Sequence, residues 1–546
     1  MKEKSTFKWM YRSCGGRIKE GVVLVVLNAW SAVCVTIFAL LSQKVMDSAQ
    51  IGDKSSLIKN SAYLLFLILS QILARVVASL VEAISQGKAE ISLRTNVFSS
   101  ILRGDYADSV ENHSGDLMTR LTADVQVVSD NYVHIFPAAI AFVVRIFSGA
   151  IALYQIDKNF ATVFVFCGLL IVVVAALSRK HLKKLHRRVQ EKDSKVRSCM
   201  QEMLENLFAI KVFGIEEKII KISVKQQSKF YREKVRKKSF SIIAGIGFSL
   251  AFAVGFLVAV AYGSYGVLNG TMTFGSVVAI VQLVNQLQSP VVGITGILPT
   301  FFAMTTSAQR LMEICGDSKE TTKDISVNYD DFVRIKVRDA VFGYGDEKVF
   351  SNASFTVNKG EFIGIKGPSG SGKSTVLKLI TGLYPVGGGK FTIETKDKEY
   401  DCKQIKNLFS FVPQGNMLFS GTVKENLTIL NPDATEDDIK NALVTASAEF
   451  AYDLDDGLDF VLGEAGAGVS EGQAQRIAIA RALLAENGVL LMDESTSALD
   501  AETEKKVINN LKDKKNLTVL IITHREAVLD KCDRVITVAN GVIEEN

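Results

Sequence analysis

Six long apolar runs in the first 302 residues constrain the fold more than any other feature of this 546-residue chain. A helix needs about 20 mostly apolar residues to cross the roughly 30 Å hydrocarbon core of a bilayer. One such run could be a helix buried in a soluble core, but six of them indicate a membrane domain. The spans that we predict run approximately over Val22–Ser42, Ser61–Val81, Ile135–Tyr154, Ala161–Leu177, Ile242–Val267 and Val277–Phe302.

Lysine and arginine are distributed unevenly among the segments that flank these spans. The leader, residues 2–19, carries six of them and residues 179–197 carry nine, whereas the connections Asp157–Asn159 and Asn269–Thr271 carry one and none. Basic loops stay on the cytoplasmic side of a membrane. We therefore expect both termini in the cytoplasm, together with the two long loops that follow the second and fourth spans.

These two loops have the residue pattern of amphipathic helices, as at 115–121 and 202–207, so we expect them to extend the membrane helices into the cytoplasm. The leader alternates aromatic residues such as Trp9 with Lys8 and Arg12. That mixture suits a short helix in the membrane interface, and it equally suits an ordinary juxtamembrane segment.

Composition excludes several classes of protein. With 48% hydrophobic and 22% charged residues, the chain can bury ample apolar surface, which excludes a disordered protein. The formal charge of +5 is too small and too dispersed for a nucleic-acid-binding surface, so we expect no nucleic-acid partner. The seven cysteines lie far apart without a CxxC pair, which is typical of free thiols rather than a disulfide framework or a zinc site.

The composition changes at the charged stretch Cys315–Glu320, where we place the end of the membrane domain. The predicted organisation is a transmembrane domain over 1–318, a linker over 319–331 and an α/β nucleotide-binding domain with a helical subdomain over 332–546. In the last of these, Ser354–Val357 and Phe362–Lys366 have the pattern of strands.

The second of these strands leads directly into a phosphate loop of the form GxxxxGK[ST], Gly367–Thr375, with a helical pattern after it. Glycines allow successive backbone N–H groups to converge on phosphate oxygens, and the helix N-terminus adds a favourable dipole. Lys373 would neutralise the β- and γ-phosphates, and Ser374 would bind Mg²⁺. The phosphate-binding residues that we predict are Gly367, Ser369, Gly370, Ser371, Gly372, Lys373, Ser374 and Thr375.

Two acidic residues end a second buried strand, Val489–Met492. Chemistry in α/β folds gathers at the carboxyl ends of parallel strands. We expect Asp493 to hold Mg²⁺, mostly through water, and Glu494 to orient and deprotonate the attacking water. Without the phosphate loop upstream, two such carboxylates could equally belong to a solvated turn.

A third motif, Val469–Arg476, opens a helix that runs to Leu484. Ser470 and Gln473 have the spacing of a capping box. The motif resembles the signature Leu-Ser-Gly-Gly-Gln of the ABC transporter ATPase family and likewise lies between the phosphate loop and the acidic strand. The resemblance implies that Ser470, Gly472 and Gln473 bind the γ-phosphate held by the phosphate loop of a second chain.

The resemblance extends to further motifs in the family's order. It implies that Tyr344 stacks on adenine, that Gln414 contacts Mg²⁺ and the membrane domain, and that His524 contacts the γ-phosphate. Gly463–Glu464 before the signature and the loop Ser497–Asp500 also match, the latter at the dimer interface. The membrane half is similar, more loosely, to the six-helix exporter type.

The signature departs from the family at Glu471, which replaces its first glycine, and at Val469. A carboxylate pointing inward would repel a γ-phosphate, so we expect Glu471 to point outward. Such a change also occurs in transporters with one weakened site and a different partner chain. Because Glu494 and His524 are both present, we favour a homodimer and keep a heterodimer as the alternative.

Taken together, the resemblance implies ATP-driven transport that uses ATP and Mg²⁺, most simply export or flipping of a peptide, a lipid or an amphipathic small molecule. The alternatives are an importer on the same fold and a nucleotide-gated regulator, and Glu494 with His524 argues against the regulator. We expect an integral protein of a bacterial cell (inner) membrane.

Polar residues inside the predicted spans do not identify the substrate. Gln282 and Gln286 lie on one face of the sixth span, where they could line a cavity or bond to another helix. Arg75 and Arg145 fall near mid-membrane, and Arg75 could pair with Glu82 two turns along its helix.

Overall fold

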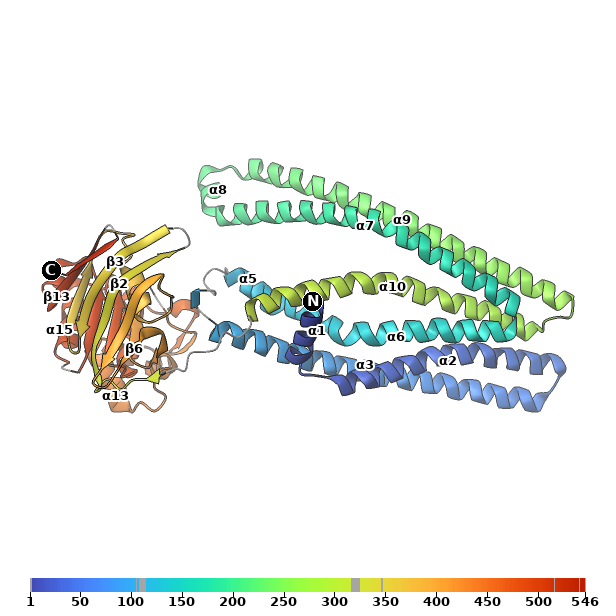
Figure 1. The fold of residues 1–546 in the computed structure, drawn as a ribbon, viewed down its shortest axis with the longest axis horizontal. Helices are drawn as coiled ribbons and strands as arrows, with labels where there is room; N and C mark the ends of the chain where they lie inside the picture. Colours follow the sequence, from blue (N-terminus) through green and yellow to red (C-terminus); the bar gives the residue numbers. More distant parts are fainter. Residues whose placement is uncertain are drawn as a thin grey trace. The chain divides into compact units, whose positions relative to one another are not determined.

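The structure is a computed structural model, and the chain divides into two compact units, residues 1–102 with 114–315 and residues 103–113 with 316–546. Helices build the first unit, and strands with short helices build the second (Figure 1). The structure describes residues 2–104, 106–107, 114–315, 325–344, 347–415, 417–514, 516–539 and 541–545.

Long helices make up the first unit. Their bounds are α1 (Lys2–Ser13), α2 (Ile18–Ile51), α3 (Lys54–Arg103), α5 (Ser114–Thr119), the π-helical turn η1 (Arg120–Asp124), α6 (Val125–Ile156), α7 (Lys158–Glu205), α8 (Leu207–Phe213), α9 (Glu216–Leu268) and α10 (Phe274–Cys315).

Each of the six predicted spans lies within one of these helices, namely α2, α3, α6, α7, α9 and α10. Within the described residues, the helices over 18–51, 54–103, 115–156 and 216–268 are long and apolar enough to cross a membrane. The described part of α10 offers a shorter apolar helix, Phe274–Leu287. The side chains of 169–181, which include much of the fourth predicted span, lie outside the described residues. As expected, α3, α7 and α9 continue well beyond the apolar runs.

Three helices, α2, α6 and α10, pack on one another, and α7 runs along α9 (Figure 1). The leader helix α1 joins the first group, because Met10 is fully buried and the Phe7 ring lies 5.9 Å from that of Phe301.

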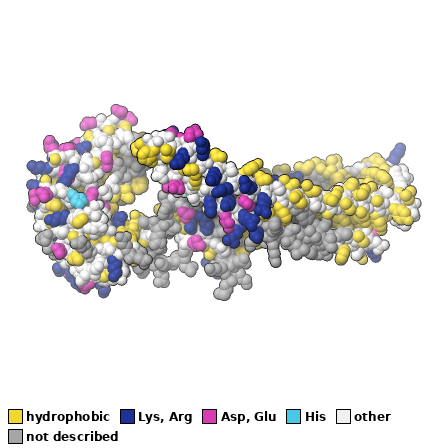
Figure 2. Space-filling model, turned by 90° about the horizontal axis from the view of Figure 1, so that it is seen from above, with side chains coloured by type: hydrophobic (Ala, Val, Ile, Leu, Met, Phe, Trp, Pro, Cys, Tyr) yellow, Lys and Arg dark blue, Asp and Glu magenta, His cyan; other side chains and the backbone are white. Residues whose placement is uncertain are grey.

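By contrast, α9 leaves large apolar side chains such as Ile243, Ile246 and Leu257 exposed. Figure 2 shows Lys and Arg gathered over one stretch of this unit, with hydrophobic side chains exposed along another. The exposed apolar length suits contact with lipid or with another chain.

Two sheets form the second unit. The larger has the order β14-β13-β4-β12-β11-β8 and is parallel except for β14, and the smaller is antiparallel with the order β3-β2-β5-β6. The bounds are β14 (Val542–Glu545), β13 (Arg534–Ala539), β4 (Phe362–Lys366), β12 (Thr518–Ile522), β11 (Val489–Asp493) and β8 (Phe409–Val412), then β3 (Glu347–Asn358), β2 (Phe332–Tyr344), β5 (Gly388–Thr395) and β6 (Glu399–Asp401).

Shorter elements connect these strands. The paired short strands are β1 (Ile325–Ser326) with β7 (Ile405–Lys406) and β9 (Gly421–Thr422) with β10 (Val461–Leu462). The α-helices are α11 (Lys373–Ile380), α12 (Val423–Thr428), α13 (Glu436–Thr445), α14 (Glu471–Leu484), α15 (Ala501–Lys512) and α16 (Glu526–Leu529). The 3₁₀ turns are η2 (Cys402–Gln404), η3 (Glu449–Tyr452), η4 (Gly457–Asp459) and η5 (Glu464–Gly466).

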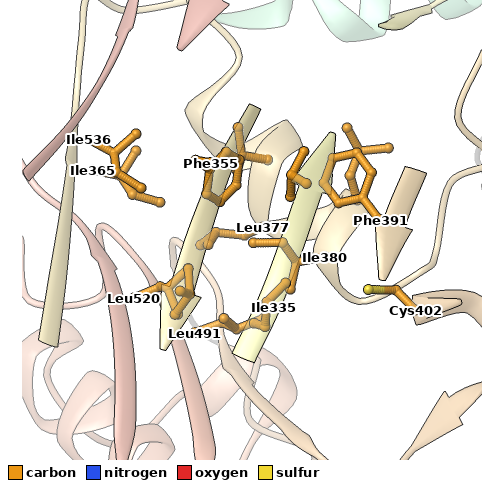
Figure 3. Close-up of a cluster of buried hydrophobic side chains, with 14 of the residues drawn as sticks. Ile335, Phe355, Ile365, Leu377, Ile380, Phe391, Cys402, Leu491, Leu520 and Ile536 are labelled. Carbon is orange, nitrogen blue, oxygen red and sulfur yellow. The ribbon is translucent and has the colours of Figure 1, made fainter. Parts of the chain in front are cut away.

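Both faces of the parallel sheet are covered. Successive side chains of a strand point to opposite faces, and β11 sends Leu491 into one hydrophobic cluster and Leu490 into the other. Figure 3 shows Leu377 and Ile380 of α11 in the first cluster, among side chains of β2 and β11. Because α11 is buried against this face of the sheet, the loop that precedes α11 is held in place.

Candidate functional site

The loop between β4 and α11 has a backbone that requires glycine. Gly367, Gly370 and Gly372 adopt φ values of +156°, +79° and +95°. A Cβ on Gly367 would lie 2.0 Å from the carbonyl oxygen of Val538, and one on Gly372 would lie 2.5 Å from Val349 Cγ1. The loop therefore curls tightly at its base, while Ser369 and Gly370 at its tip are exposed.

Lys373 begins α11 and turns its ammonium back over the loop. Its Nζ donates to the carbonyl oxygens of Gly367 at 3.0 Å and Pro368 at 2.8 Å, although the residue is only 6% exposed. Ser371 Oγ is buried and has no hydrogen-bond partner among the described residues. An enclosed ammonium and an unpaired hydroxyl are donors that an anion can take up.

Ser374 and Asp493 meet beside this loop, where Ser374 Oγ donates to Asp493 Oδ1 at 2.9 Å. Asp493 ends β11 and is buried. Its pKa is raised, first because burial removes the carboxylate from water and further because Glu494 is adjacent, while the hydrogen bond from Ser374 opposes the rise. A hydroxyl and a carboxylate at this distance form an oxygen pair that a hard divalent cation could bind.

Glu494 is held between two side chains from neighbouring strands. Gln414 Nε2 donates to its Oε2 at 2.9 Å, and His524 Nε2 lies 3.3 Å from its Oε1. Gln414, Glu494 and His524 follow β8, β11 and β12, which are adjacent in the parallel sheet. Their meeting thus follows from the strand order, since the carboxyl ends of parallel strands share one edge. Glu494 also has φ +46°, a strained conformation that is enriched at functional sites.

Ser470 caps α14 through the predicted capping box. Its backbone N–H donates to Gln473 Oε1 at 2.8 Å, and its Oγ accepts from Gln473 N at 3.3 Å. Gly472 packs closely, because a Cβ there would lie 2.9 Å from the carbonyl oxygen of Ala498. Glu471 is exposed at the first turn of the helix. No hydrogen bond within the described part of the chain joins Ser470, Gly472 or Gln473 to the phosphate loop.

Tyr344 lies at the end of β2, close to the helix that follows the phosphate loop. Its hydroxyl is 3.3 Å from Thr375 Oγ1, and its ring is edge-on to Phe342 and Tyr384 at centroid distances of 5.0 and 5.6 Å. The side chain is 44% exposed, which leaves it accessible to a planar ligand. Tyr384 was not among the sequence-predicted residues, and only its aromatic character shortly after α11 could have drawn attention to it.

The sequence also did not predict the contacts of Arg525, the residue that follows His524. Arg525 donates to Glu504 Oε2 at 2.7 Å, to the Leu499 carbonyl at 3.1 Å and to the Ser497 carbonyl at 3.0 Å. Glu504 is buried and also accepts from Thr496 at 2.7 Å. This network ties the segment after β12 to the loop Ser497–Asp500, against which α14 packs.

Comparisons with known proteins found matches to both units of the chain. The family of ABC transporter transmembrane regions matches residues 22–291, and the family described as ABC transporter matches residues 350–497. An uncharacterized ABC transporter ATP-binding protein of Bacillus subtilis is 29% identical over 472 residues, covering 84% of this chain and 80% of that protein.

Two further similarities span nearly the whole chain. A putative export ATP-binding/permease protein of Rickettsia bellii is 25% identical over 541 residues, covering 96% of this chain and 93% of that protein. The solved structure of a bacterial Atm1-family ABC exporter with ATP bound matches with a TM-score of 0.81, covering 97% of this chain and 96% of that one. At 20% identity, this last similarity concerns the fold alone.

Proposed function

Because this chain is an ABC transporter of the exporter type, with one helical membrane domain and one ATPase domain, we propose that two copies assemble and hydrolyse ATP at their interface. Hydrolysis would drive export or flipping of a peptide, a lipid or an amphipathic small molecule. The observation that carries the proposal is the meeting of Gln414, Glu494 and His524 beside the phosphate loop.

The proposed organisation is a membrane domain over 1–318, a linker over 319–331 and an ATPase domain over 332–546. The clustering of lysine and arginine in residues 2–19 and 179–197 supports a cytoplasmic location for the ATPase domain and both termini. We place the protein in a bacterial cell (inner) membrane because its relatives include ABC transporter proteins of Bacillus subtilis and Rickettsia bellii.

The phosphate loop would bind the triphosphate of ATP. The backbone N–H groups of 369–375 and the unpaired hydroxyl of Ser371 would donate to phosphate oxygens, and Lys373 would exchange its carbonyl partners for the β- and γ-phosphates. Tyr344 would stack on the adenine ring.

Mg²⁺ would be held by Ser374, Asp493 and Gln414, and when bound it would neutralise charge on the phosphates. The 2.9 Å contact between Ser374 and Asp493 supports this oxygen pair as part of its shell. Among the described residues no group of three His, Cys, Asp or Glu side chains could hold a metal alone. The remaining positions would fall to phosphate oxygens and water, as Mg²⁺ prefers.

Glu494 would accept a proton from the attacking water. Gln414 and His524 hold its two carboxylate oxygens at 2.9 and 3.3 Å, which fixes the direction of the free lone pairs. His524 would then contact the γ-phosphate, and the Arg525–Glu504 network would keep it in place.

Ser470, Gly472 and Gln473 would reach the γ-phosphate held by the other copy. The exposed, capped N-terminus of α14 supports this, because it presents a positive dipole end and, among the described residues, has no hydrogen bond to the phosphate loop of its own chain. The exposed position of Glu471 is compatible with a homodimer that has two working sites.

Complementation tests the shared site. Lys373→Ala removes the loop cation, and Ser470→Asp keeps a good N-cap while placing a carboxylate where the γ-phosphate would bind. Each variant alone should be inactive. A mixed dimer, purified through two different tags, should recover ATPase activity, because one of its sites retains both Lys373 and Ser470. A mixed dimer as inactive as the separate variants would contradict a site shared between chains.

A further inference from the structure

Basic residues are concentrated on two neighbouring helices just outside the apolar spans. Residues 179–188 of α7 contain six Lys and Arg and no acidic residue, and residues 229–238 of α9 contain six with one acidic residue, Glu233. The formal charge of the whole chain is only +5. These two segments, which we call the cationic band, therefore carry a larger positive excess than the chain as a whole.

The structure places the two segments of the band side by side. Helix α7 runs along α9, and Lys237 Nζ donates to His186 Nδ1 at 2.9 Å. A histidine nitrogen accepts a hydrogen bond only in the neutral ring, so this contact adds no negative charge. Figure 2 shows Lys and Arg gathered over one stretch of the unit. The band is thus one surface that two helices build together.

Few cations of the band have a partner. Arg187 pairs with Glu191 at 2.9 Å, and Lys234 Nζ lies 5.6 Å from the centre of the Phe230 ring. Within the described part of the chain, no hydrogen bond or ion pair engages the charged groups of Lys184, Arg188, Lys229, Arg232, Arg236 and Lys238. All of these except Arg188 are exposed. Like charges on one surface repel, and anions from outside the chain would relieve that repulsion.

The band lies at the depth of phospholipid head groups. Lys238 precedes Ile242, where the fifth predicted span begins, by four residues, and Lys234 precedes it by eight. These offsets correspond to about 6 and 12 Å along the helix. The head-group layer occupies roughly 5–8 Å on each side of the hydrocarbon core, and long basic side chains can extend toward it. Ile242 and Ile243 are exposed, as residues in contact with lipid would be.

We propose that the cationic band binds the anionic head groups of phospholipids in the cytoplasmic leaflet. Lysine and arginine at this level attract an anionic bilayer surface, and the guanidinium fork matches phosphate oxygens. The same surface of a second copy would repel the band, because it carries the same charge. The inference rests on the cytoplasmic placement proposed above. It goes beyond the transport function, because it assigns a class of bound lipid and no transported substrate.

Native mass spectrometry of the full-length protein in detergent tests the band directly. Titrations with palmitoyl-oleoyl-phosphatidylglycerol and palmitoyl-oleoyl-phosphatidylcholine compare an anionic and a zwitterionic head group on the same acyl chains. The wild type should bind phosphatidylglycerol about tenfold more tightly. Lys234→Gln/Arg236→Gln/Lys238→Gln should weaken binding of phosphatidylglycerol by about tenfold, because each cation near an anionic head group contributes up to about fivefold in affinity. It should leave binding of phosphatidylcholine within about twofold.

Lys218→Gln/Lys221→Gln/Lys225→Gln is the matched control. It removes the same charge from three exposed residues of the same helix. Lys225 lies 17 residues before Ile242, or about 25 Å along the helix, which exceeds the screening length of about 8–10 Å. This variant should keep its affinity for phosphatidylglycerol within about twofold. An equal loss in the two variants would show an effect of net charge alone and would overturn the proposal.

A second variant tests the other helix of the band. Lys184→Gln/Arg187→Gln/Arg188→Gln should also weaken binding of phosphatidylglycerol, and it carries the test if the α9 variant fails to fold by gel filtration. Equal binding of the two lipids by the wild type, or unchanged binding of phosphatidylglycerol by both band variants, would overturn the proposal. A hepta-glutamate peptide that binds the wild type as tightly as phosphatidylglycerol would also overturn it, in favour of an acidic protein partner.

ATPase activity of the wild type in phosphatidylcholine nanodiscs separates this inference from the proposed function. A wild type that prefers phosphatidylglycerol but lacks ATPase activity would count against the proposed function alone. A wild type that hydrolyses ATP but binds the two lipids equally would overturn only the lipid-binding surface.

Discussion

Because the phosphate loop is tightly packed at its base, we predict that Gly367→Ala and Gly370→Ala will lower the free energy of unfolding by different amounts. In Gly367→Ala the new Cβ would lie 2.0 Å from the carbonyl oxygen of Val538, which belongs to the backbone of β13 and cannot rotate away. In Gly370→Ala the new Cβ meets nothing within 4 Å, so only the φ value of +79° opposes it.

The magnitudes follow from these two situations. A non-glycine residue in a left-handed conformation costs about 1–2 kcal/mol, which is the whole expected cost of Gly370→Ala. Gly367→Ala adds overpacking against a fixed carbonyl, typically about 1–3 kcal/mol more, for a total of about 2–5 kcal/mol. Domains of this size lose roughly 2–4 °C in unfolding temperature per kcal/mol, so the two variants should be separable.

Thermal unfolding of the full-length protein in detergent, without nucleotide, is the assay. The ATPase-domain transition should fall further in Gly367→Ala than in Gly370→Ala. Equal shifts in the two variants, or a larger shift in Gly370→Ala, would refute the reasoning from the Val538 contact.

Three further changes probe individual side chains of the site. Because burial raises the pKa of Asp493, its ionised form destabilises the fold at neutral pH, and this penalty disappears as the pH falls below the ordinary value of an aspartate. Asp493→Asn should therefore raise the unfolding temperature of nucleotide-free protein at about pH 8, and the gain should shrink toward about pH 4; a gain that grows on acidification would contradict the assignment. Lys373→Ala should weaken ATP binding by about 10- to 100-fold in an equilibrium nucleotide-binding assay, because charge-assisted hydrogen bonds contribute about 1.5–3 kcal/mol, whereas Lys378→Ala on the same helix should bind nearly normally. Ser470→Ala should cost about 1 kcal/mol of stability through loss of the N-cap, whereas Ser470→Asp should keep that stability; equal losses in a thermal-unfolding comparison would argue against the cap.

Local sequence patterns predicted the elements of the ATPase half well. Strand Phe362–Lys366 and the capping box at Ser470 occur as expected, because both depend on neighbours in the chain. Predicting that Gln414, Glu494 and His524 lie together requires the order of the strands in the sheet. The residues alone did not show that order, and the family resemblance only implied it.

The sequence could not predict contacts between segments that lie far apart in the chain. Arg525 pairs with Glu504 across 21 residues, and nothing in either local pattern indicates the other. In the membrane half, helical spacing offered Glu82 to Arg75, but the structure pairs Glu82 with His134, 52 residues away on another helix. Helical periodicity shows which residues share one face of a helix, but it does not show which residues of another helix lie opposite that face.

The most direct test of the central claim compares ATP hydrolysis by the purified full-length protein in nanodiscs with that of Glu494→Gln, with Glu502→Gln as a charge-matched control at an exposed residue of α15. The wild type and Glu502→Gln should hydrolyse ATP, and Glu494→Gln should bind ATP normally while its hydrolysis falls by about 10²- to 10⁴-fold, the usual contribution of a general base. Substantial hydrolysis by Glu494→Gln would contradict the assignment of the base, and a folded, ATP-binding wild type without hydrolysis would contradict a self-sufficient homodimer.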